Sequence, residues 1–304
     1  DLIEKDRLLN VLFIHAKSGL DQSRVHEINM HAFNANDDRL SAVSAGLAAL
    51  RHLKVDLPDK PTQRHVLSGL IKMQVLLARK SMDDLINLPV MDDPVVERVH
   101  GIVRVLQSTA YTTSPNLVPL LIMKVVELSL KHGNGSLSAF AYVGYGFLVT
   151  VGLGDFRKGS EFGKTALRVA ERVGLERERY AAKGMHATLL QAWTEPVRNT
   201  LPLLLDSYQA SRSLVGDYLQ ASNSALIYCY HGFWAGLRLP DLEAEAATYL
   251  HEIRAMKQTA VLNYQRFYHQ SILNLMGKSE DPCRIVGTSY DAEAMLPQHI
   301  ATRE

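Results

Sequence analysis

A glycine-rich stretch, GLGDFRKGSEFGKTAL at residues 152–167, contains the residue types that bind phosphate. A phosphate-binding P-loop reads G-x-x-x-x-G-K-[S/T], follows a strand and opens a helix. Counting back five residues from Gly163 gives Lys158, and Gly159 comes one residue too late. The apolar residues around Gly163 recur with helical spacing, so the backbone N–H groups here are used inside a helix. The stretch therefore predicts a helix–turn–helix joint, and we expect no ATP binding and no cofactor.

A second pattern, His26-Glu27 followed by His31, is one residue longer than the H-E-x-x-H motif of zinc proteases. Five residues turn a helix by about 500°, so the two imidazoles point about 140° apart. They cannot share a metal ion as residues at i and i+4 do. We expect solvent-facing or interface histidines and no metal site.

The densest aromatic cluster is YCYHGFW, residues 228–234. Cys229 with His231 as its base would make a nucleophile pair, but side chains two residues apart on a helix diverge. Packing of Tyr228, Cys229 and Phe233 against neighbouring helices is the favoured interpretation. Part of the cluster is nevertheless predicted to form an interaction surface. Its candidate residues are Tyr228, Tyr230, His231 and Trp234.

The elements that must position these residues are helices, and no run alternates with the period of a strand. Pro94 behind Asp93, Pro115 behind Ser114 and Pro196 behind Thr194 have the spacing of helix starts. Short Gly-Asp links such as 154–155 and 216–217 favour antiparallel neighbours. The predicted helices lie near 2–17, 21–35, 38–53, 62–79, 94–113, 115–131, 137–153, 156–173, 177–193, 196–214, 217–236, 240–256 and 259–277.

A degenerate internal repeat indicates how the helices pack. Tetratricopeptide repeats place small residues seven apart where two helices cross closely. Ala42 with Ala49, and Gly159 with Ala166, have this spacing. We therefore predict an all-α fold, a tetratricopeptide-like superhelical array of antiparallel hairpins (an α-solenoid). The array is predicted to span residues 1–277, and residues 278–304 to be a connector with the start of a following helical segment.

Composition limits the partners. The 304 residues carry 33 Lys and Arg against 32 Asp and Glu, a net charge of +1 without a basic run, which disfavours nucleic acid. Two cysteines favour a reducing compartment and hence the cytoplasm. The uncharged stretch 132–154 is interrupted by polar residues and glycines, so we expect no membrane insertion. The sequence is interpreted as a piece of a longer protein.

Several longer phrases carry a resemblance to a known family. They are GLAALRHLKVDLPDKPTQ (46–63), DDLINLPVMDDP (83–94), SPNLVPLLIMKVVELSLKHGNGSLSAFAYVGYG (114–146), LRLPDLEAEAATY (237–249) and NLMGKSEDPCRIVGTSYDAEAMLPQH (274–299). They resemble the helical region that follows the predicted STAND-type ATPase module in large bacterial signalling proteins. Those proteins also contain a serine/threonine-kinase-like domain, a GAF sensor and a histidine kinase. The resemblance covers nearly the whole chain.

The resemblance implies a regulatory role without catalysis, because the catalytic motifs of that family lie in other modules. Its implied partners are protein domains of the same or an associated signalling chain. Two other functions stay open on the sequence. One is a stand-alone peptide-binding adaptor of the tetratricopeptide type, and the other is an all-helical enzyme with a small-molecule pocket near residues 228–234.

Overall fold

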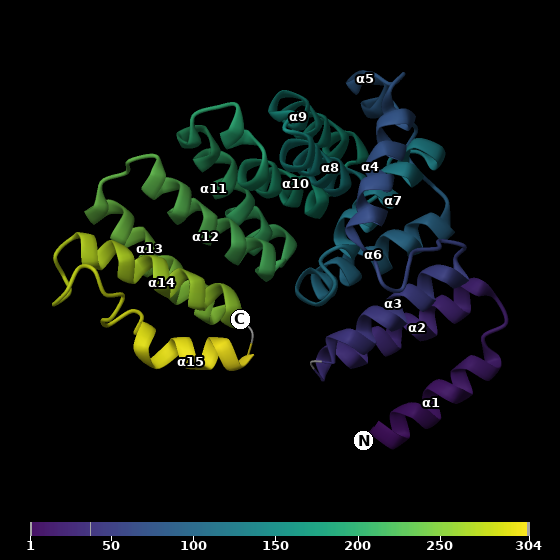
Figure 1. The fold of residues 1–304 in the computed structure, drawn as a ribbon, viewed down its shortest axis with the longest axis horizontal. Coiled ribbons are helices and arrows are strands. Elements are labelled where there is room, and N and C mark those ends of the chain that lie inside the picture. The colour runs from purple at the N-terminus through teal and green to yellow at the C-terminus, as the bar shows by residue number, and fades with distance from the viewer. Residues whose placement is uncertain (1, 37, 303–304) are drawn as a thin grey trace. The chain divides into compact units, whose positions relative to one another are not determined.

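The computed structural model describes residues 2–36 and 38–302, and within these ranges it is all-α (Figure 1). The described chain contains fifteen α-helices and two isolated β-bridges, and no strand. The helices of the first part are α1 (Leu2–His15), α2 (Gly19–Ala35), α3 (Arg39–His52), α4 (Gln63–Leu77), α5 (Met82–Ile86), α6 (Pro94–Thr113), α7 (Leu117–His132), α8 (Ser138–Leu153) and α9 (Phe156–Val173). Those of the second are α10 (Glu176–Leu189), α11 (Leu201–Ala210), α12 (Tyr218–Trp234), α13 (Leu239–Ala255), α14 (Thr259–Leu275) and α15 (Ala292–Thr302).

The chain divides into two compact units, unit 1 up to Leu175 and unit 2 from Glu176 onward. In unit 1, α2 packs on α3, α6 on α7, α7 on α8, and α8 on α9. In unit 2, α10 packs on α11, α11 on α12, α12 on α13, and α13 on α14. Consecutive helices thus dominate the contacts of unit 2, whereas unit 1 also packs helices that are not consecutive, α3 on α6, α4 on α7 and α5 on α9. The predicted boundary between residues 277 and 278 stays a prediction, and residues 303 and 304 lie outside the described part.

Of the three helix starts predicted beside prolines, the structure confirms one and shows that two are wrong. The Asp93 carboxylate accepts hydrogen bonds from the backbone N–H groups of Val95 and Val96, with Pro94 in the first turn, as predicted. The prediction for Ser114 is wrong, because its N–H closes α6 on Ala110 and α7 starts only at Leu117.

The predicted start at Thr194 is also wrong. Its N–H donates to the carbonyl of Gln191 and ends a 3₁₀ turn, so Thr194 closes the preceding segment. A second 3₁₀ turn spans Val197–Thr200, and α11 starts at Leu201. The single helix predicted for 196–214 is therefore three segments, the last of which is a π-helical turn at Ser211–Val215.

The α8–α9 hairpin shows how a short local signal determines packing. Gly154 ends α8 in the left-handed conformation (φ 70°), and the Asp155 carboxylate accepts from the N–H of Lys158 at 3.0 Å. A Cβ atom on Gly159 would lie 2.7 Å from the carbonyl oxygen of Gly146, so the two backbones approach closely at this point. The rings of Tyr142, Tyr145 and Phe162 pack together in the core of this hairpin.

The small residues predicted at helix crossings are buried. Ala42, Ala49 and Ala166 each have no exposed surface. Between Ala42 and Ala49, a Cβ on Gly46 would lie 2.8 Å from a methyl carbon of Leu106 on α6 and 3.0 Å from the sulfur of Met30 on α2. The small face of α3 is therefore in contact with side chains of both neighbouring helices.

Replacing Ala166 with leucine is expected to lower the melting temperature of the protein, because overpacking a filled core costs about 1–3 kcal/mol. The matched surface change is Arg168→Ala. Arg168 makes an ion pair of 2.9 Å with Asp83 in which both side chains are more than half exposed, and such pairs contribute little. Thermal denaturation followed by circular dichroism measures both variants. A neutral Ala166→Leu with a strongly destabilising Arg168→Ala would mean that the other face of α9 is buried.

A Gly-Asp turn like the one between α8 and α9 recurs in unit 2. Gly216 is left-handed (φ 72°), and the Asp217 carboxylate accepts from the N–H of Gln220 to start α12. The core between α12, α13 and α14 then forms around a buried apolar cluster. Its members include Leu226, Cys229, Leu242, Ala246, Ile253 and Ile272.

The segment after α14 returns along that helix and is held by it. Asn274 donates its side-chain amide to the carbonyl of Arg284 at 2.6 Å, and Arg266 donates Nε to the carbonyl of Ser289 at 2.7 Å. The side-chain carbonyl of Gln270 accepts from the Ser289 N–H at 2.9 Å. Because Gln270 and Asn274 are almost fully buried, the polar side of α14 is occupied by the backbone of residues 282–290.

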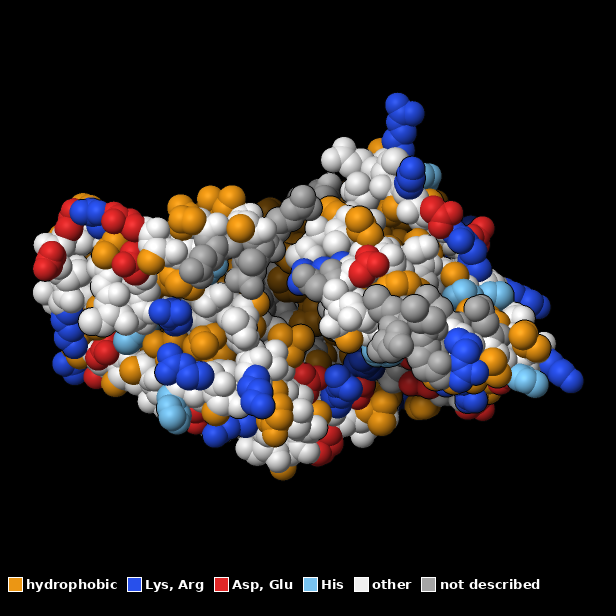
Figure 2. All heavy atoms as spheres, turned by 90° about the horizontal axis from the view of Figure 1, so that it is seen from below, with side chains coloured by type: hydrophobic (Ala, Val, Ile, Leu, Met, Phe, Trp, Pro, Cys, Tyr) orange, Lys and Arg blue, Asp and Glu red, His pale blue; other side chains and the backbone are white. Residues whose placement is uncertain are grey.

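Charged side chains of opposite sign are interspersed on the face drawn in Figure 2. This distribution agrees with the near-balance of 33 basic and 32 acidic residues. Within the described ranges, every helix falls short of the combination of length and hydrophobicity that a bilayer crossing requires.

Candidate functional site

The glycine-rich stretch joins the end of α8 to α9, as the sequence predicted, and its Gly163-Lys164-Thr165 part lies inside α9. Gly163 and Thr165 are buried against neighbouring helices, and Lys164 faces outward between them. The three residues therefore do not share a surface that a phosphate group could approach. The P-loop interpretation fails on geometry as well as on spacing.

The histidines of the second pattern do not converge. The His26 ring stacks on His52 with 5.0 Å between centroids and meets the edge of Phe13 at 4.8 Å, whereas His31 is exposed. Burial lowers the pKa of His26. Among the side chains that the structure describes, no group of three His, Cys, Asp or Glu could hold a metal ion.

Cys229 and His231 face different partners. The Cys229 thiol is buried and receives a hydrogen bond from the amide of Gln265 on α14 at 3.3 Å. Burial raises the pKa of this thiol to about 12, so it stays protonated at neutral pH and is a poor nucleophile. His231 lies 2.7 Å from the hydroxyl of Thr200 through Nδ1, and burial lowers its pKa. Cys229 thus packs against α14, which is the interpretation that the sequence favoured, and the His231 ring is placed beside Thr200.

A partly exposed aromatic group remains, which we call the aromatic surface: Tyr230, Phe233 and Trp234 on α12 with Phe267 and Tyr268 on α14. Trp234 and Phe267 are its exposed members, and the other three are half-buried. The Tyr230 ring lies 5.2 Å from that of Tyr268 and 6.2 Å from that of Trp234, between ring centroids. Trp234 is 63% exposed and Phe267 is 40% exposed. A cavity of about 120 Å³ opens between the two helices, lined by Tyr230, Phe233, Trp234, Tyr268, Cys229 and Ile272, with Ser271.

The structure brings two of the four predicted surface residues together. Tyr230 and Trp234 both line the cavity. His231 is only 7% exposed, because its ring is placed beside Thr200 in the interior. Tyr228 turns toward α13, where its hydroxyl lies 3.4 Å from the Glu245 carboxylate. Phe267 and Tyr268, which complete the aromatic surface, lie on another helix and were not predicted.

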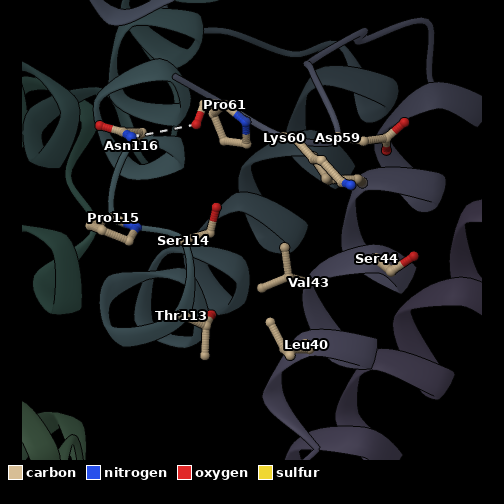
Figure 3. Close-up of a pocket in the computed structure, with 11 residues that line it drawn as sticks. Leu40, Val43, Ser44, Asp59, Lys60, Pro61, Thr113, Ser114, Pro115 and Asn116 are labelled. Carbon is tan, nitrogen blue, oxygen red and sulfur yellow. Dashed lines mark hydrogen bonds between the residues drawn. The ribbon is translucent and has the colours of Figure 1, made fainter. Parts of the chain in front are cut away.

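A larger cleft of about 510 Å³ lies in unit 1 and was also not predicted (Figure 3). In Figure 3, Leu40 and Val43 on α3 lie opposite Thr113 and Ser114 at the end of α6. The Asn116 side chain donates to the carbonyl of Pro61 at 3.4 Å and joins two walls of the cleft. The other lining residues are Ser44, Leu47, Asp59, Lys60 and Pro115.

The cleft has mixed chemistry. Buried Val43 and Leu47 line it with apolar surface, and its charged residues are Asp59 and Lys60. The Asp59 carboxylate is already bound to the guanidinium of Arg51. The charge of Asp59 is thus compensated by a cation that lies outside the lining of the cleft.

Comparison with known proteins gives one distant similarity. No family model matches the chain, and no solved structure matches it. A stretch of 153 residues, 49% of the chain, is 26% identical to hybrid signal transduction histidine kinase G of Dictyostelium discoideum. The similarity is to a signalling protein. It covers 4% of the length of that kinase, so the matched region is a small part of a much larger protein.

Proposed function

We propose that the chain is a non-catalytic, regulatory and protein-interaction arm of a multidomain signal-transduction protein. The similarity to a hybrid histidine kinase supports the signalling context. The packing of many helices on their sequence neighbours supports the role as an interaction arm. Arrays of stacked helices offer long binding surfaces and connect distant ends. Cys229 and Cys283 are both free thiols, which supports a cytoplasmic location.

We also propose that the hairpins follow tetratricopeptide-like geometry within each unit. Two observations support it: the repeated Gly-Asp turns at 154–155 and 216–217, and the buried small residues at spacing seven. In such an array a larger side chain at a crossing changes the angle between hairpins. Ala166→Leu is then expected to disturb regulation in a full-length protein while leaving its ATP affinity unchanged.

The aromatic surface is the observation that carries the proposal. Tyr and Trp supply large contact areas and are enriched among the residues that dominate binding energy at protein interfaces. A Trp side chain that is 63% exposed beside an apolar cavity is an arrangement that a partner side chain would bury. The partners that we propose are protein domains of the same or an associated signalling chain.

Replacing Trp234 with alanine is expected to weaken binding of those domains by about tenfold or more, as for a residue central to an interface. Calorimetric titration of the chain with the purified neighbouring domains measures the effect. Trp193→Ala is the matched control, since Trp193 is 53% exposed, lies outside the aromatic surface, and should change affinity less than twofold. Equal effects of the two variants, or none from Trp234→Ala, would count against the aromatic surface as the binding site.

A further inference from the structure

Helix α4 exposes an apolar stripe on the side that faces away from the core of unit 1. Leu67, Ile71 and Val75 are 58%, 59% and 71% exposed, and their spacing of four places them in one line along the helix. The opposite side is buried through Leu70, Met73 and Leu77. A helix normally turns its polar side to water. The exposed stripe is therefore surface that folding of the described chain leaves uncovered.

The same segment is positively charged. From Lys60 to Met82 the sequence contains no Asp or Glu, in a chain whose net charge is only +1. The Lys and Arg residues of the segment are Lys60, Arg64, Lys72, Arg79 and Lys80. Within the described part of the chain, only Lys72 among them forms a salt bridge, at 2.8 Å to Glu127. Cations therefore flank the apolar stripe at both ends of α4, and the first acidic residues after them are Asp83 and Asp84, of which Asp84 is attracted by Lys80.

We propose that this stripe is a docking site for an amphipathic helix of a partner protein, with an apolar stripe bordered by Asp and Glu. The idea rests on the proposed role as an interaction arm and assigns a second binding surface, separate from the aromatic surface. A second helix that packs alongside α4 would bury apolar side chains spaced four residues apart. The flanking cations supply the charge complementarity that selects an acidic partner and orients it.

Two other occupants fit less well. In a second copy of the chain, α4 against α4 would bring Arg64 of one copy near Arg79 or Lys80 of the other, and like charges oppose such pairing. A membrane-binding helix presents a broad apolar side with Trp or Phe. Helix α4 has no aromatic residue of that kind, and its other apolar side is in the core.

The test uses the whole chain and two synthetic peptides of about 21 residues, three heptads with Leu at the apolar positions. One peptide carries Glu at every flanking position and the other carries Lys. Fluorescence anisotropy measures binding of each labelled peptide. We expect the Glu peptide to bind, with an affinity that falls as salt is raised, and the Lys peptide to bind at least about tenfold more weakly.

The variant Ile71→Ser with Val75→Ser is expected to weaken binding of the Glu peptide by about tenfold or more. Its control is Ile28→Ser, since Ile28 is 53% exposed on α2 of the same unit. Circular dichroism confirms folding of each variant, and the buried side of α4 is unchanged in both. Trp234→Ala should leave binding of the Glu peptide intact, so a failure here is distinguishable from a failure of the aromatic surface.

Several results would overturn the assignment. They are equal binding of both peptides, no loss of binding in the double variant, and concentration-dependent dimerisation of the chain that the double variant abolishes. A membrane surface is tested by sedimentation with vesicles of phosphatidylcholine and phosphatidylserine. If the wild type binds these vesicles but not the Glu peptide, and the double variant no longer binds the vesicles, α4 is assigned to a membrane surface instead.

Discussion

Replacing Gly159 with alanine is expected to lower the free energy of unfolding by about 3 kcal/mol, at the upper end for an overpacked contact. A Cβ at this position would lie 1.9 Å from the hydroxyl of Thr150 and 2.7 Å from the carbonyl oxygen of Gly146. The Thr150 side chain can rotate away, but the Gly146 carbonyl belongs to the backbone of α8. The whole α8–α9 hairpin must therefore open slightly to admit one methyl group.

Chemical denaturation followed by far-ultraviolet circular dichroism measures this effect. Tryptophan fluorescence is unsuitable, because Trp193 and Trp234 both lie in unit 2 and Gly159 lies in unit 1. Gly174→Ala is the control: Gly174 is left-handed (φ 76°) and no atom lies within 4 Å of the added carbon. It should cost about 1 kcal/mol from backbone strain alone. If Gly174→Ala were the more damaging of the two, close contact of α8 with α9 would not be important for stability.

Acidification is expected to destabilise the protein through His100, which is fully buried on α6. Its Nδ1 accepts a hydrogen bond from the Leu137 N–H at 3.4 Å, so a proton on Nδ1 would meet a second donor. Burial lowers the pKa of His100 from 6.5 to about 4, although the nearby Glu97 carboxylate opposes the shift. Between these values the unfolded chain binds a proton that the folded chain does not bind.

The sign of the effect follows from this difference in bound protons. Above about pH 6.5 the titration of His100 does not change the free energy of unfolding, because neither state binds the proton. As the pH drops from there toward 4, the free energy of unfolding falls by about 3 kcal/mol in total, at about 1.36 kcal/mol per pH unit. Unfolding free energies at pH 7 and pH 4.5 measure the loss. Because His26 and His231 also have lowered pKa values, the informative quantity is the difference from His100→Gln. An unchanged pH dependence in that variant would exclude His100 as the source.

Sequence reasoning succeeded where the signal is local. The Gly154-Asp155 and Gly216-Asp217 turns each need a left-handed residue followed by a capping carboxylate, and two adjacent residue types reveal both. The buried side of α9 was predictable because its apolar residues leave one clear polar side. For α4 the same method gives the helix but not its orientation, since residues on both sides are apolar.

Sequence reasoning failed where distant segments meet. The unit 1 cleft joins Leu40, Lys60 and Pro115, and no local pattern connects these positions. The aromatic surface was half predicted, because Tyr230 and Trp234 lie in one aromatic phrase while Phe267 and Tyr268 come from α14. Thr194 and Ser114 were assigned to helix starts because capping residues are recognised by type. Their N–H groups in fact close the segments before them.

The hydrogen bonds between α14 and residues 282–290 have a consequence for mutational tolerance. These hydrogen bonds reach mainly backbone groups, including the carbonyls of Pro282, Arg284 and Ser289 and the N–H of Ser289. Exposed side chains of this segment can therefore be replaced without changing the path of its backbone, but a proline at 289 would remove a donor. Gly287 and Tyr290 are further exceptions, because a Cβ on Gly287 would lie 2.7 Å from the side-chain carbonyl carbon of Gln270 and Tyr290 is buried. Gln270 and Asn274 have no such freedom. The path of the chain between α14 and α15 is therefore determined by side chains of α14 more than by the side chains of the connecting segment itself.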